Sequence, residues 1–73
     1  SVFPNPAADK LVIVNKDNQP LLKIELIDFM GRKVLVGEGK ERLELNLTHV
    51  SSGFYWIRIT TRDSTETVVI KKK

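Results

Sequence analysis

The sequence predicts an all-β fold, a small antiparallel β-sandwich of about seven short strands. Three observations support this prediction. Apolar and polar residues alternate along several segments, which is the pattern of strands with one buried face. Turn-forming residues interrupt these segments at short intervals, which favours an antiparallel sandwich over a parallel sheet. No segment shows a convincing helical period.

The first twenty residues contain an extended entry and one strand. Residues 3–7 include two prolines and are expected to add a short edge strand, because proline is tolerated at sheet edges and strand starts. Residues 10–14 are rich in β-branched side chains and predict a short strand. The turn-rich residues 15–20 end it.

A predicted hairpin follows in residues 22–36. Residues 22–28 alternate, with Leu22, Ile24 and Leu26 on one face, and a turn over residues 28–31 leads to a return strand at residues 33–36. Residues 37–40 are expected to form a flexible connection, because their two glycines tolerate positive φ.

The second half of the chain predicts three more strands. Residues 43–47 place leucines on alternate positions, residues 48–53 form a loop or single turn, and residues 54–60 form a strand. After a turn at residues 62–64, residues 67–71 form the last strand. The side chains expected in the core are those of Leu11, Ile13, Ile24, Leu26, Val34, Leu45, Leu47, Tyr55, Ile57, Ile59, Val68 and Ile70.

Length and composition limit the class of protein. Seventy-three residues correspond to one domain, and a chain of this size buries only roughly 60% of its unfolded surface. There is no cysteine to form a disulfide or act as a thiolate. The longest apolar runs are far shorter than a membrane-spanning helix requires, so no transmembrane segment is expected. The first residues lack the pattern of a signal peptide, so any export signal is expected upstream.

The charge of the chain argues against nucleic acid as a partner. The net charge is +3, but without Lys71, Lys72 and Lys73 the remaining nine basic residues balance nine acidic ones. Acidic residues are interspersed among the basic ones and interrupt any stripe that could follow phosphates.

The chemistry-bearing residues do not predict an enzyme or a cofactor site. His49 is the only histidine, and no carboxylate and nucleophile can be assigned to it as a catalytic set. The ligands of a zinc site are missing, and no calcium-loop or phosphate-binding pattern is present. We therefore expect no catalytic residue, no metal and no cofactor.

An ordered set of motifs covers the whole chain. Phe3-Pro4-Asn5-Pro6-Ala7 opens it, Asp28-Phe29-Met30-Gly31-Arg32 ends the alternating strand, Gly53-Phe54-Tyr55 precedes the last hairpin, and Lys71-Lys72-Lys73 closes a β-branched strand. In this order and spacing the set resembles the type A C-terminal sorting domain of the bacterial type IX (Por) secretion system. The pair Phe29-Met30 departs from the pair that this family often carries.

The resemblance implies an immunoglobulin-like fold and a role as a secretion address. It implies that residues 1–73 are one sorting domain, taken from the end of a larger secreted protein. The implied partners are an N-terminal cargo domain, the type IX outer-membrane translocon and its shuttle proteins, and a sortase-like surface peptidase that usually removes the domain. The implied route runs through the periplasm to the outer-membrane surface or the medium.

The family motifs supply the candidate recognition residues, and several also have a structural interpretation. Gly31 is expected at a positive-φ turn position, with Asp28 accepting turn amides or pairing with Arg32. Gly53 is expected to allow a tight strand entry, and Tyr55 to be a core aromatic whose hydroxyl reaches a backbone group. The candidates are Pro4, Asn5, Pro6, Gly31, Arg32, Gly53, Tyr55, Lys71, Lys72 and Lys73.

Phe54 and Trp56 form a candidate interface. They lie on the strand face opposite Tyr55 and Ile57 and are expected to be partly exposed, with Val69 beside them. An alternative function follows from this pair, because the fold alone does not specify function. The alternative is an accessory β-sandwich module that binds carbohydrate or a partner protein through these aromatic rings.

Overall fold

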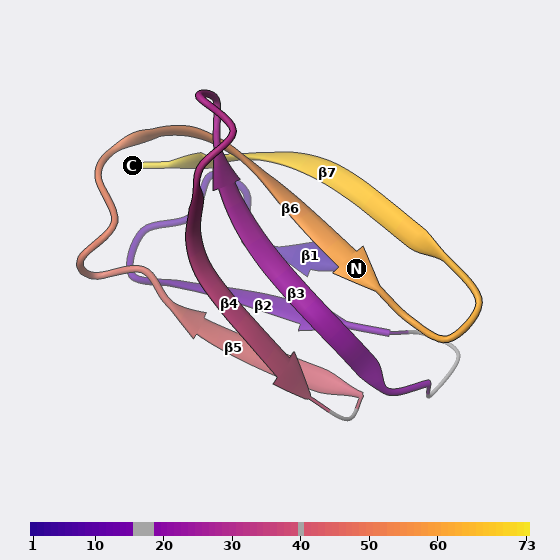
Figure 1. Ribbon diagram of the computed structural model, residues 1–73. Coiled ribbons are helices and arrows are strands. Elements are labelled where there is room, and N and C mark those ends of the chain that lie inside the picture. The colour runs from indigo at the N-terminus through magenta and orange to yellow at the C-terminus, as the bar shows by residue number, and fades with distance from the viewer. Residues whose placement is uncertain (16–18, 40) are drawn as a thin grey trace.

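The computed structural model describes residues 1–15, 19–39 and 41–73, without the side chain of Leu22. These residues form seven strands and no helix, in two antiparallel sheets packed together (Figure 1). No helix in the described ranges is long and apolar enough to cross a membrane. The predicted all-β sandwich is confirmed.

The smaller sheet, sheet A, has the strand order β1-β2-β5. These strands are β1 (Val2–Phe3), β2 (Lys10–Val14) and β5 (Arg42–Asn46). Sheet B has the order β4-β3-β6-β7. Its strands are β3 (Leu21–Asp28), β4 (Lys33–Gly39), β6 (Gly53–Thr60) and β7 (Thr65–Lys72). Its outer strands are therefore β4 and β7.

The core lies between the sheets and contains the alternating apolar side chains of both. Burial of each large aliphatic side chain contributes roughly 1.5–3 kcal/mol, so these residues provide the main stabilisation. The predicted core residues that are buried are Leu11, Ile13, Ile24, Leu26, Leu45, Leu47, Tyr55, Ile57, Ile59 and Ile70. Val68 and Leu43 are half-buried and pack against this core.

The prediction that Val34 is a core residue is wrong. Leu26 pairs with Leu35, whereas Ile27 pairs with Lys33, so Val34 is an extra, unpaired residue in β4. A bulge of this kind changes which side chains face inward. Val34 is 38% exposed as a result, and Leu35 packs against the core in its place.

A second irregularity lies at the start of β3, which begins at Leu21, one residue before the predicted start. The register shifts between Leu21 and Ile24, and both of these side chains are buried. The prediction for the side chain of Leu22 lies outside the described residues, as do Lys16, Asp17 and Asn18 of the predicted turn.

Several predicted boundaries are wrong. Gly37 and Gly39 belong to β4 and not to a flexible connection, while Lys40 lies outside the described residues. A Cβ on Gly37 would lie 3.0 Å from Leu43 Cδ2, so a larger residue there would require the Leu43 side chain to shift. The edge strand is Val2–Phe3, and the last strand begins at Thr65.

Candidate functional site

The two ends of the chain meet at the outer edge of β7. Asn5 Nδ2 donates to the Val69 carbonyl at 3.2 Å, and Asn5 Oδ1 accepts from the Lys71 amide at 3.1 Å. The Ala7 amide donates to the Lys71 carbonyl at 2.8 Å, and the Ala7 carbonyl accepts from the Lys73 amide at 2.8 Å. We call this set of hydrogen bonds the terminal clasp.

The terminal clasp follows from the chemistry of a strand edge. The outer strand of a sheet presents unpaired N–H and C=O groups, and these need partners or cover. Pro4 and Pro6 have no N–H to offer, so the donors come from the Asn5 side chain and the Ala7 backbone. Ala7 is fully buried and forms a parallel bridge with Lys72. The clasp thus covers the end of the β7 edge.

The sequence placed the Pro4–Asn5–Pro6 motif and the three lysines at opposite ends of the chain, and the structure brings them together. Pro4, Pro6, Lys71 and Lys73 are exposed, whereas Lys72 is half-buried. Lys71 Nζ lies 5.7 Å from the centroid of the Phe54 ring, a cation–π distance. Among the described residues, none of the three ammonium groups forms an ion pair with a carboxylate.

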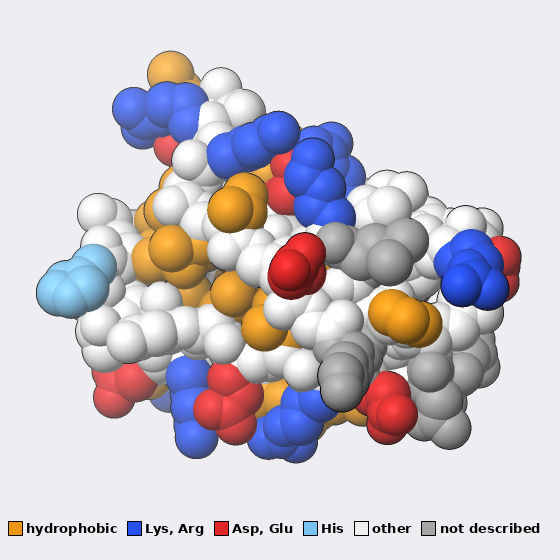
Figure 2. Space-filling view, turned by 60° about the horizontal axis from the view of Figure 1, so that its bottom comes forward, with side chains coloured by type: hydrophobic (Ala, Val, Ile, Leu, Met, Phe, Trp, Pro, Cys, Tyr) orange, Lys and Arg blue, Asp and Glu red, His pale blue; other side chains and the backbone are white. Residues whose placement is uncertain are grey.

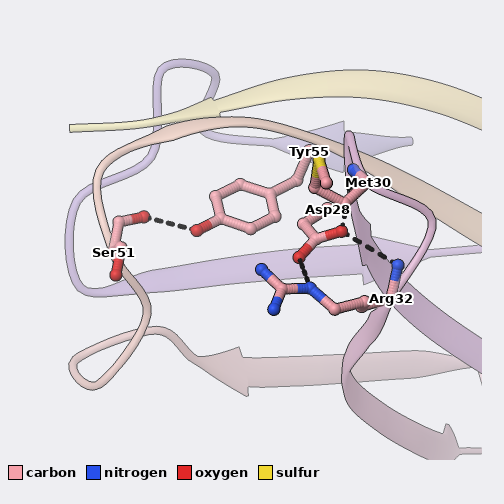
Figure 3. A network of polar contacts seen from close by, with 5 residues as sticks. All are labelled: Asp28, Met30, Arg32, Ser51 and Tyr55. Atoms are coloured by element: carbon pink, nitrogen blue, oxygen red, sulfur yellow. Dashed lines mark hydrogen bonds and ion pairs between the residues drawn. The ribbon is translucent and has the colours of Figure 1, made fainter.

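The turn between β3 and β4 is held by Asp28 (Figure 3). Asp28 Oδ1 accepts from the Met30 and Arg32 amides, both at 2.9 Å, and Oδ2 accepts from Arg32 Nε at 2.8 Å. The backbone hydrogen bond from Arg32 is the main reason that the pKa of Asp28 lies below its usual value. Gly31 has φ +87°, so its predicted turn role is confirmed.

Tyr55 connects the core to the loop over residues 48–53. Its ring is buried, and its hydroxyl donates to the Ser51 carbonyl at 2.7 Å (Figure 3). The predicted structural role of Tyr55 is therefore confirmed. Gly53, at φ +144°, begins β6 beside it, and Val50 of the same loop is buried in the core. Sequence reasoning missed Val50, because an isolated apolar residue in a loop has no periodic partner.

An aromatic cluster lies on the outer face of sheet B. We define it as Phe29, Phe54 and Trp56, which are 53%, 54% and 36% exposed. Phe29 stacks on Trp56 with ring centroids 4.5 Å apart and planes inclined by 23°, and Phe29 lies 6.1 Å from Phe54. Val69 pairs with Trp56 and is also exposed. The predicted exposure of Phe54 and Trp56 is confirmed.

Sequence reasoning missed Phe29 as a member of this cluster. The available signal was the position of Phe29 directly after the alternating strand. Asp28 pairs with Tyr55 in antiparallel strands, so Phe29, the next residue, comes beside Phe54, which precedes Tyr55.

A cationic cluster surrounds a buried carboxylate on the same face. Glu25 is only 2% exposed; Arg58 Nε lies 2.8 Å from its Oε1, and Lys33 Nζ and Lys23 Nζ lie 3.0 and 3.6 Å from its Oε2. The Arg58 hydrogen bond first, and the Lys33 contact second, lower the pKa of Glu25 to about 2. We call Lys23, Lys33 and Arg58 the cationic cluster. Their side chains remain 41–54% exposed.

The surface elsewhere carries mixed charges and has no cluster suited to a metal. Figure 2 shows hydrophobic side chains across the middle of one face, with an acidic side chain beside them and basic and acidic side chains along its margins. In the described ranges no three His, Asp or Glu side chains come together as a metal site. His49 is exposed in the loop before β6.

A family model described as a secretion system C-terminal sorting domain matches residues 1–72 of the chain. A search among curated proteins returned no match.

Proposed function

The chain belongs to the family of secretion system C-terminal sorting domains, and from this we propose that it acts by protein–protein recognition on the type IX route. The observation that carries the proposal is the match of the family model over residues 1–72, the whole length of the folded domain. The family consists of sorting signals and not of catalysts, and we assign no catalytic step to this domain.

The route and the partners complete the proposal. A cargo domain precedes the sorting domain, and the joined protein crosses the periplasm to the outer membrane. Shuttle proteins and the outer-membrane translocon bind the sorting domain and deliver the cargo to the cell surface or the medium. A sortase-like surface peptidase then removes the domain.

The structure supports a recognition site built around the terminal clasp. The exposed residues Pro4, Pro6, Lys71 and Lys73 lie in or beside the hydrogen bonds of the terminal clasp, along one strand edge. Among the residues that the structure describes, these lysines have no carboxylate partner, and such cations favour acidic groups on a receptor. Gly31, Arg32, Gly53 and Tyr55 contribute by fixing the two adjoining loops.

Strand addition is a second element of the proposed recognition. An extended receptor segment that pairs with a sheet edge gains main-chain hydrogen bonds without requiring a particular sequence. Because the terminal clasp covers β7 from Val69 onward, a receptor strand pairs either with residues 65–68 or with the end of β7 after clasp release.

The test is export of a periplasmically targeted fluorescent reporter fused before residue 1, in a type IX-competent strain and in its translocon mutant. Surface or medium fluorescence in the first strain only is the expected result. Replacing Lys71, Lys72 and Lys73 by Gln keeps the backbone of the clasp and is expected to reduce export. The matched control replaces Lys10, Arg42 and Arg62 by Gln, which removes the same charge elsewhere.

Two results would contradict the proposal. The first is retention of the reporter in both strains, and the second is unchanged export by the triple-lysine variant together with a Pro4→Ala and Pro6→Ala variant.

The alternative, an accessory module that binds carbohydrate or a partner protein, is favoured by one observation, the exposed aromatic cluster. Loss of glycan or partner binding by Trp56→Ala, with export unchanged, is the outcome that this alternative predicts.

A further inference from the structure

The outer face of sheet B combines apolar area with positive charge. On β6 the side chains of Phe54, Trp56 and Arg58 point to this face, and on β7 those of Val69 and Lys71 lie opposite them. The aromatic cluster is thus flanked by Lys71 at one side and by the cationic cluster at the other. Adjacent exposed aromatic rings are typical of protein interfaces, where aromatic residues and arginine are enriched.

The positive charge on this face is fixed in position. The carboxylate of Glu25 is buried, while the three cations that surround it keep their side chains about half exposed. Three positive charges against one buried negative charge leave the cluster with a net charge of +2. Without its last three lysines the domain is neutral, so the excess positive charge of this cluster is balanced by acidic residues elsewhere in the domain.

The aromatic cluster is better suited to a protein than to a sugar. A sugar ring binds flat against an open aromatic face, and Phe29 stacks on Trp56 with ring centroids 4.5 Å apart, so one face of the indole is occupied. The ring of Phe54 is inclined by 33° to that of Phe29, so the three rings do not form one flat platform. Apolar side chains of a partner protein can contact the exposed parts of these rings without such a platform.

The start of the chain lies in the other sheet. The Ser1 amino group donates to the Val14 carbonyl, and Val2 pairs with Ile13 in sheet A. A domain fused before Ser1 therefore begins from sheet A and not from sheet B.

We propose that the outer face of sheet B docks an acidic protein surface. Apolar side chains of the partner pack on Phe29, Phe54 and Trp56, and its carboxylates face Arg58 and Lys33 on one side and Lys71 on the other. The inference rests on the proposed function, in that the partner is a protein of the type IX machinery. It adds a second contact area that does not depend on the terminal lysines alone.

The experiment is site-specific photo-cross-linking during export. Phe54 is replaced by p-benzoylphenylalanine in the reporter fusion described above, which retains an aromatic ring on the exposed face. The matched control carries the same amino acid at Phe3, an exposed aromatic residue of sheet A. Products are identified by mass spectrometry in the type IX-competent strain, together with the cross-linked peptide.

The expected product joins Phe54, and not Phe3, to a type IX protein through a segment in which Asp and Glu outnumber Lys and Arg. Cross-linking to the fused cargo, to a second copy of the chain or to lipopolysaccharide would overturn the proposal. Equal products from both positions, or export without any product from Phe54, would overturn it as well.

A variant separates this proposal from the proposed function. The pair Phe29→Ala and Trp56→Ala removes two anchor rings and is expected to reduce export at least about tenfold, the effect of losing two interface hot spots. Protease resistance of the fusion confirms that the variant is folded, and Arg62→Ala in the distant β6–β7 turn is the control. If this pair is exported normally while the triple-lysine variant is not, the docking face is refuted and the sorting function stands. If both are exported normally, the docking face is refuted, and the recognition site at the terminal clasp is refuted with it when the Pro4→Ala and Pro6→Ala variant is exported normally as well.

Discussion

Gly31 and Asp28 together determine the turn that positions Phe29. Asp28 accepts two turn amides and the Arg32 guanidinium, which closes the turn around its carboxylate. Gly31 provides the left-handed backbone conformation, at φ +87°, that lets the chain reverse within so few residues. The aromatic cluster therefore depends on two residues that do not belong to it.

Replacing Gly31 by Ala is expected to lower the free energy of unfolding by about 1–2 kcal/mol, the cost of a left-handed conformation for a residue with a Cβ. No atom lies within 4 Å of the added Cβ, so the penalty arises from the backbone and not from a clash. Urea unfolding followed by fluorescence of Trp56 measures it. Gly31→Asn is the control and should lose less, since Asn tolerates this conformation; equal stability of the Ala variant and the native chain would contradict the argument.

At the scale of elements, Glu25 joins three strands of sheet B. Its carboxylate lies on β3, Lys33 comes from β4 and Arg58 from β6. A buried carboxylate destabilises a fold unless it is paired, and Glu25 is paired with three cations. The same contacts that position the cationic cluster therefore hold neighbouring strands in register.

The pH dependence of stability should show the role of Glu25. The pKa in the folded state, about 2, lies below the reference value of 4.5, so the ionised form is stabilised by folding. This contribution is present above pH 4.5 and is lost as the pH falls from 4.5 towards 2. Glu25→Gln is expected to be less stable at pH 7 and to approach the native chain at low pH.

Urea unfolding of both chains between pH 7 and pH 2 tests this expectation. The pKa values of Asp28 and Glu44 are also lowered, by hydrogen bonds from Arg32 and Arg42, and their contributions occur in both chains. The difference between the two curves therefore belongs to Glu25. Parallel curves would show that Glu25 contributes no pH-dependent stability.

The success of sequence-based prediction differs between elements for a physical reason. In β6, Tyr55, Ile57 and Ile59 alternate with larger or polar outward residues. The sequence therefore indicates which side chains face the core, and it correctly predicts that Trp56 is exposed. In β4, residues 34–36 are all apolar, so no alternation indicates which of their side chains face the core. The bulge at Val34 depends on pairing with β3, which a local pattern does not contain.

The candidate site was predictable in its parts and not in its assembly. The motifs with Asn5 and Lys71 could be identified, but their contact joins residues 66 positions apart. The burial of Glu25 was missed because an acidic residue at an outward strand position indicates solvent exposure. Its partners from β4 and β6 become visible only in the folded sheet.

At the scale of the whole molecule, the terminal clasp connects the first and last segments of the chain along β7. Asn5 both donates and accepts in this clasp, which requires an amide side chain. Asn5→Asp keeps the acceptor for the Lys71 amide but loses the donor to the Val69 carbonyl. Hydrogen exchange at the Ala7 and Lys73 amides is expected to accelerate, because local opening becomes easier.

The control for this variant is Asn46→Asp. The Asn46 side chain accepts from the Thr48 amide and hydroxyl through Oδ1, a role that a carboxylate also fills. Exchange at Ala7 and Lys73 should be unchanged in this control. Unchanged exchange in Asn5→Asp as well would mean that the clasp does not protect the end of β7.

The terminal clasp also determines which cleavage positions leave the edge of β7 covered. A cut ahead of Ser1 leaves Asn5 and Ala7 in place, and the released piece is closed along the end of β7. A cut between Ala7 and Lys10 frees the covering segment and leaves a bare strand edge, the kind of surface on which chains aggregate. Two cleavage positions less than ten residues apart are thus expected to give products that differ in aggregation, because only the first leaves the end of β7 covered.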